Sequence, residues 1–170
     1  MNVVMVVLRL THIFAGIFWV GTVWYFALFF LPRVKTFGQD TGRIMQTMSA
    51  QPFPAYMTTA AVLVAISGIL MYANASAGFS GAWIATPAGI VLTLAAILGI
   101  LAVLEAVLVS RPTAERMAQL GREVAASAGP PSPAVMQEMQ ALSAKLERAV
   151  YRTAYIVLVT VIGMAIFRYV

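Results

Sequence analysis

Apolar residues along this chain are gathered into four long runs, at residues 3–31, 55–73, 87–110 and 150–170. Each run is long enough to cross the hydrocarbon layer of a membrane as a helix, which takes roughly 20 residues at about 1.5 Å of rise per residue. Backbone polar groups in lipid must be satisfied within the chain, so four spans predict helices and not an open sheet. The pattern predicts an all-α integral membrane protein, a four-transmembrane-helix bundle that forms one membrane domain over residues 1–170.

The polar segment between the third and fourth runs has a helical pattern of its own. Apolar residues at helical spacing flank a Pro- and Gly-rich interruption: Met117, Leu120 and Val124 before it, and Met136, Met139, Leu142 and Leu146 after it. Pro112 suits the first turn of the helix before the interruption. We therefore expect a cytoplasmic helical hairpin over residues 112–149. A shorter surface helix is expected near residues 42–49.

Composition agrees with a membrane protein, because 61% of the residues are hydrophobic and 10% are charged. The formal charge of +5 comes from eleven Lys and Arg residues, and all of these except Arg9 and Arg168 lie in or beside the loops at 32–54 and 111–149. The link between the second and third runs has none. The positive-inside rule then predicts a bacterial-type inner (plasma) membrane protein with both loops in the cytoplasm and both termini outside. The basic residues indicate topology and contact with the lipid bilayer, with no nucleic-acid partner.

The chain contains no cysteine. This excludes disulfides, thiolate metal sites and covalent attachment of a c-type haem. Any haem would have to be held without a covalent bond to the protein.

The first run holds two ionisable side chains, Arg9 and His12, and His12 is the only histidine. Ionisable groups within a span are expensive unless they face the protein, so they are candidates for a functional site. Together with Gly16 and Trp19 they lie on one stripe of a helix. An imidazole can ligate haem iron, a glycine lets a flat ring approach, and an arginine can pair with a propionate. The alternative is an arginine that extends to the membrane surface and a histidine bonded to a neighbouring helix carbonyl.

The first two runs resemble a known family in their sequence. Residues 9–13 (RLTHI), Trp19 and residues 29–33 (FFLPR) look like the first helix of the haem-b-binding four-helix membrane protoporphyrinogen oxidases, which belong near the copper-resistance-D-like membrane proteins. Residues 57–60 (MTTA) with Gly68 are similar to the second helix of that family. The resemblance implies that His12 is a haem ligand.

Other parts of the chain differ from the family pattern. The third helix of those oxidases has a lysine a turn after a tryptophan, but here Trp83 is followed by residues 84–87 (IATP), and the third run has no lysine. The hairpin at 112–149 has no counterpart in the family. These differences favour haem binding over the specific oxidase activity.

A single histidine cannot supply both axial ligands of one haem within one chain. The second ligand would be Met164 of the fourth run, at a similar depth by helical rise, or His12 of a second copy in a homodimer; otherwise the iron is five-coordinate. The two Met-x-x-Met pairs, Met45/Met48 and Met136/Met139, have the spacing of an apolar helix face, which favours packing. Thioethers also suit Cu(I), so copper is the alternative metal.

The function expected from these residues is that of a haem-b-binding membrane protein with an electron-transfer or oxidoreductase role, whose redox partner is a quinol or a porphyrinogen. The alternatives are a protoporphyrinogen oxidase-like enzyme and a copper-handling or transport protein. No catalytic residue is assigned. Glu105, the other charge within a run, is expected to pair with Arg152 or to serve a proton path.

Overall fold

The computed structural model describes residues 2–34, 36–37, 44, 47, 52–127 and 130–170, and no strand occurs in these ranges. The helices are α1 (Val3–Tyr25), η1 (Phe26–Phe30), α2 (Leu31–Val34), α4 (Phe53–Ala75), α5 (Gly81–Ile84), α6 (Pro87–Glu105), η3 (Ala106–Ser110), α7 (Arg111–Ala126), α8 (Pro133–Ile166) and η4 (Phe167–Tyr169). Four continuous helices are long and apolar enough to cross a membrane: Val3–Val34, Phe53–Ala75, Pro87–Ala126 and Pro133–Tyr169. The prediction of an all-helical chain with four such helices is confirmed. The surface helix expected near residues 42–49 lies largely outside the described residues.

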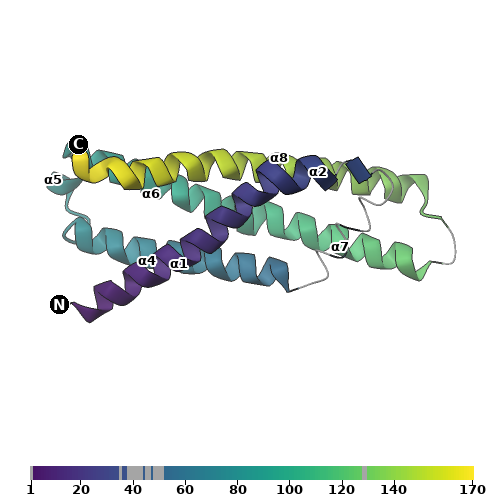
Figure 1. Cartoon of the computed structure of the whole chain (residues 1–170), viewed down its shortest axis with the longest axis horizontal. Coiled ribbons are helices and arrows are strands. Elements are labelled where there is room, and N and C mark those ends of the chain that lie inside the picture. The colour runs from purple at the N-terminus through teal and green to yellow at the C-terminus, as the bar shows by residue number, and fades with distance from the viewer. Residues whose placement is uncertain (1, 35, 38–43, 45–46, 48–51, 128–129) are drawn as a thin grey trace.

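The long helices are arranged as two pairs. The most extensive contacts join α1 to α4 and α6 to α8, and α1 crosses obliquely from α4 toward α8 (Figure 1). Both chain ends and α5 lie at one end of the molecule, which we call the terminal end. At the other end, which we call the hairpin end, α7 packs against the first half of α8 (Figure 1).

The two pairs meet in a small core made mostly of short side chains. Trp19 and Val23 of α1 pack with Ala60, Ala61, Ala102 and Val157, all of which are buried. Small residues let helix backbones approach closely. Helices in a membrane associate through such packing, because lipid tails are as apolar as the side chains and burial gains no hydrophobic free energy. Large apolar side chains such as Phe14, Ile17 and Leu94 are instead more than half exposed on the outer faces, as contact with lipid requires.

Two of the long helices contain a π-helical segment near the hairpin end. In η1 the Leu31 amide donates to the Phe26 carbonyl, and in η3 the Arg111 amide donates to the Ala106 carbonyl, so each bond spans five residues. Each segment ends two residues before a proline, which cannot donate and whose ring disturbs the preceding turn. The sequence predicted that the first helix ends at residue 31, before Pro32, and that Pro112 begins a separate helix. Both helices instead continue through the proline.

The link between α4 and α6 is tightly folded at the terminal end. Ala77, Gly78 and Phe79 all have positive φ, and the buried Ser76 hydroxyl donates to the Tyr72 carbonyl and accepts from the Phe79 amide. Gly89, near the start of α6, lies directly under this link: a Cβ there would be 2.1 Å from the Trp83 carbonyl oxygen. Only a glycine fits at this position without movement of the backbone.

The expected ion pair between Glu105 and Arg152 is present. Nε of Arg152 donates to both carboxylate oxygens of Glu105, at 2.7 and 2.9 Å, and its Nη2 also donates to Oε1. The Glu105 side chain is 10% exposed and that of Arg152 is 58% exposed. The pair therefore joins α6 to α8 where a nearly buried carboxylate meets an accessible guanidinium.

Candidate functional site

His12 lies on α1 and is held by two hydrogen bonds to α4. Its Nδ1 is 3.0 Å from the carbonyl oxygen of Val64 and 3.2 Å from Oγ of Ser67. Because a carbonyl oxygen only accepts, Nδ1 must carry the proton and donate it. The Ser67 hydroxyl donates to the Leu63 carbonyl, so it also offers a lone pair to Nδ1. In its neutral form the imidazole is therefore the Nδ1–H tautomer, in which Nε2 has an unprotonated lone pair.

The ring of His12 rests directly on the backbone of Gly68. A Cβ at Gly68 would lie 2.9 Å from Cε1 and 3.3 Å from Nδ1 of the imidazole. His12 is half-buried, and no protein atom in the described ranges forms a hydrogen bond with its Nε2. The contact with α4 thus engages Nδ1, and Nε2 has no hydrogen bond within the described ranges.

The other three residues of the predicted stripe have different surroundings. Arg9 is exposed one turn nearer the terminal end and forms no ion pair within the described residues. A Cβ on Gly16 would lie 4.0 Å from a methyl group of Val64, so a side chain of α4 faces this glycine. Trp19 is 3% exposed and belongs to the core between the two helix pairs.

Along the stripe Arg9 is therefore exposed, His12 and Gly16 are half-buried against α4, and Trp19 is buried. The sequence suggested an alternative to haem ligation, in which the histidine is hydrogen-bonded to a carbonyl of a neighbouring helix. The structure contains this bond, from Nδ1 of His12 to the Val64 carbonyl of α4. It does not compete with ligation at Nε2, because the two interactions use different nitrogens. In metalloproteins a ligating histidine commonly donates its other ring N–H to a carbonyl or carboxylate.

The candidate methionine ligands are placed less favourably. Met164 is half-buried on α8 and follows Gly163, which packs on Ala95 of α6, whereas His12 lies in the contact of α1 with α4. Met136 is 46% exposed on the hairpin, and Met45 and Met48 lie outside the described residues. No group of three or more His, Asp or Glu side chains that could hold a metal ion occurs in the part of the chain that the structure describes. The second axial ligand and the copper site stay predictions.

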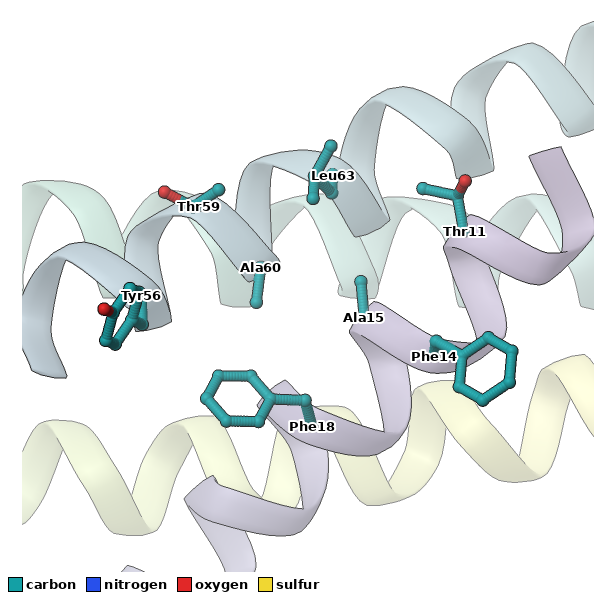
Figure 2. Close-up of a pocket in the computed structure, with 8 residues that line it drawn as sticks. All are labelled: Thr11, Phe14, Ala15, Phe18, Tyr56, Thr59, Ala60 and Leu63. Carbon is teal, nitrogen blue, oxygen red and sulfur yellow. The ribbon is translucent and has the colours of Figure 1, made fainter. Parts of the chain in front are cut away.

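A shallow groove of about 510 Å³ follows the outer seam between α1 and α4 (Figure 2). Both helices contribute residues at i, i+3, i+4 and i+7: Thr11, Phe14, Ala15 and Phe18 from α1, and Tyr56, Thr59, Ala60 and Leu63 from α4. His12 does not line this groove, so the groove and the stripe occupy different sides of α1. Its apolar, open form suits contact with lipid.

Sequence reasoning singled out His12 but not the groups that orient it. Val64 acts through its backbone carbonyl, which any residue would supply, so no sequence signal could have identified it. Ser67 is a polar residue within an apolar run, and that was the available signal. Gly68 entered only as part of the family resemblance.

Four long apolar helices and a polar site between two of them define a multi-pass α-helical membrane protein. No family model matches the chain, and no curated protein or solved structure is significantly similar to it. The resemblance to haem-b-binding oxidases therefore rests on the quoted residues alone. What the protein does has to follow from its own side chains.

Proposed function

We propose that this protein binds haem b through Nε2 of His12 and has an electron-transfer or oxidoreductase role at the membrane. The observation that carries the proposal is the hydrogen bond from Nδ1 to the Val64 carbonyl. In the neutral ring this bond leaves the lone pair of Nε2 for a metal ion. An Nδ1–H imidazole ligates iron through Nε2, as proximal histidines do. As the neutral Nδ1–H tautomer, His12 would have the protonation state that an axial ligand requires.

Neighbouring residues support the same role. Gly68 and the two α4 acceptors hold the imidazole in one orientation, which favours ligation because no rotamer freedom is lost on binding. Arg9 has a guanidinium without an ion-pair partner among the described residues, one turn from His12, and would pair with a propionate carboxylate. Haem bound here would supply one-electron redox chemistry between a hydrophobic donor, a quinol or a porphyrinogen, and an acceptor.

We also propose the orientation of the chain in the membrane. Nine of the eleven basic residues lie in or beside the loops at 32–54 and 111–149, which places the hairpin end in the cytoplasm of a bacterial-type cell and both termini outside. On this topology Arg9 and His12 belong to the outer half of the bilayer.

The test is the visible absorption spectrum of the purified full-length protein, oxidised and reduced with dithionite, after haem supplementation. The wild type is expected to show a Soret band that sharpens on reduction, and His12→Ala is expected to lose it. Thr11→Ala, which changes the neighbouring residue on the groove side, is the matched control and should keep the spectrum.

A colourless wild type would contradict the proposal. Stoichiometric copper that is lost in His12→Ala would then favour copper handling. Restoration of haem synthesis in cells that lack their own oxidase would instead identify the more specific protoporphyrinogen oxidase activity.

A further inference from the structure

A second cavity, of about 150 Å³, lies inside the bundle near the hairpin end. All four long helices line it, with Trp19 and Phe26 from the first, Phe53 from α4, Ala106 from the third and Thr153 from α8. Both π segments contribute to its wall, so the widened turns of η1 and η3 border the space. The cavity is separate from the groove of Figure 2 and does not include His12.

The hydroxyl of Thr153 is the feature that the fold leaves unexplained. Thr153 is 3% exposed, and its Oγ1 is fully buried without a hydrogen-bond partner among the described residues. Five other threonines of the long helices donate their hydroxyls to the carbonyl four residues earlier; these are Thr22, Thr58, Thr93, Thr113 and Thr160. Leaving a buried hydroxyl without a hydrogen bond is unfavourable, so we expect its partner to be a bound molecule.

The size and the walls of the cavity define that molecule. Water takes about 30 Å³, and apolar cavities of about 150 Å³ accept a benzene-sized compound. Trp19, Phe26 and Phe53 provide aromatic surface for a flat ring. Arg111 is the one charged and exposed residue of the lining. The other lining residues are uncharged, so the cavity suits a neutral ligand.

We propose that this cavity binds the ring of a membrane quinone or quinol, with the Thr153 hydroxyl donating to a ring oxygen. Such a ring is neutral, soluble in lipid and monocyclic in its smallest forms, and its oxygens accept hydrogen bonds. Its use as a redox partner rests on the proposed haem function, but its binding does not. Trp19 connects the two sites: it lines the cavity and lies seven residues from His12 on the same stripe, roughly 10 Å along the helix axis.

The experiment measures binding of p-xyloquinone to the full-length protein in detergent by quenching of tryptophan fluorescence. Durene has methyl groups in place of both carbonyl oxygens, and its affinity is measured by competition with p-xyloquinone. Thr153→Val keeps the shape of the side chain and removes the hydroxyl. Thr160→Val is the matched control, because the Thr160 hydroxyl already donates to Ile156 and does not line the cavity.

Thr153→Val is expected to weaken the binding of p-xyloquinone about fivefold, which is the effect of losing one neutral hydrogen bond. The affinity for durene should not change. Thr160→Val should bind both compounds as the wild type does. Ala106→Leu, which fills the cavity from η3, should abolish binding of both while gel filtration and helical content stay normal.

Equal quinone affinity in the wild type and Thr153→Val would overturn the proposal, as would full binding to Ala106→Leu. So would a wild type that binds no p-xyloquinone, since the cavity would then hold only water. His12→Ala is expected to keep quinone binding while it loses the Soret band, so failure of the haem proposal and failure of this one are distinguishable.

Discussion

His12 shows how one polar side chain can depend on the backbone of another helix. Its Nδ1 donates to the Val64 carbonyl, and its ring lies where a side chain of residue 68 would otherwise be. The Val64 carbonyl oxygen also lies 3.2 Å from Oγ of Ser67, so the His12 ring and the Ser67 hydroxyl share this backbone acceptor. Orientation of the imidazole is therefore a property of the α1–α4 contact as a whole, and a change on α4 alone should alter it.

Gly68→Ala is expected to displace the imidazole, because the new Cβ would lie 2.9 Å from its Cε1. Overpacking of this kind costs about 1–3 kcal/mol. If the ring shifts and the Nδ1 hydrogen bond breaks, haem binding is expected to weaken about tenfold. Haem titration monitored at the Soret band measures the effect, and the nitrogen chemical shifts of the imidazole report the displacement without haem.

Gly16→Ala is the matched control, since its Cβ would lie at an ordinary 4.0 Å from Val64 on the same helix interface. It should bind haem as the wild type does. Equal haem affinity in Gly68→Ala and Gly16→Ala would mean that the contact does not orient the ring.

Glu105 and Arg152 differ in exposure, so we expect removal of one partner of the ion pair to destabilise the protein more than removal of the other. Arg152→Met should lower the melting temperature more than Glu105→Gln, because it leaves a nearly buried carboxylate without its cation. Glu105→Gln leaves only an exposed guanidinium unpaired. The double variant should recover part of the loss. Thermal unfolding in one detergent measures all three, and an equal effect of the two single variants would contradict the asymmetry.

Residue-scale prediction from the sequence succeeded where a residue type was unusual in its setting. A lone histidine and a lone glutamate within apolar runs marked His12 and Glu105, and the partner of Glu105 was identified because Arg152 is the basic residue at the start of the fourth run. Thr153 could not be identified, because its type does not distinguish it from the other threonines. Only the packed structure shows that its hydroxyl lacks a partner.

At the scale of elements, hydropathy predicted the helices but not their continuity. A proline after a polar residue is typical of a helix start, so Pro112 indicated a boundary between the third span and the hairpin. The chain instead widens one turn before each proline, as η1 and η3. Whether a helix stops or widens depends on packing beyond the proline, here of α7 on α8, and this is not visible in the local sequence.

The close packing of Gly89, near the start of α6, against the α4–α6 link can be tested by substitution. Gly89→Ala would place a Cβ 2.1 Å from the Trp83 carbonyl and 2.9 Å from Ile84, which are backbone contacts that cannot rotate away. It should destabilise the protein by about 2 kcal/mol or more. Gly81→Ala, with no atom within 4 Å of its new Cβ, should stay within about 0.5 kcal/mol of the wild type. Thermal unfolding measures both, and a neutral Gly89→Ala would show that the link is loosely held.

At the scale of the whole molecule, the two helix pairs place the two proposed sites at different depths. His12 lies in the α1–α4 contact, in the half of α1 nearer the chain's start, and residues of all four long helices line the cavity proposed for the quinone. Small residues allow the pairs to approach in between, at Ala61 and Ala102. On the proposed topology, the haem would lie toward the outer surface and the quinone toward the cytoplasm, with Trp19 between them.

This arrangement depends on the orientation in the bilayer, which single cysteines can test because the chain has none of its own. Ala82→Cys lies on exposed α5 at the terminal end, and Gln137→Cys lies on the exposed part of α8 in the hairpin. A membrane-impermeant maleimide added to intact cells should label Ala82→Cys and should label Gln137→Cys only after permeabilisation. The reverse pattern would invert the topology and place His12 in the inner half. Labelling of both in intact cells would mean that the hairpin does not lie in the cytoplasm, so its basic residues would need another explanation, such as contact with anionic lipid at the outer surface.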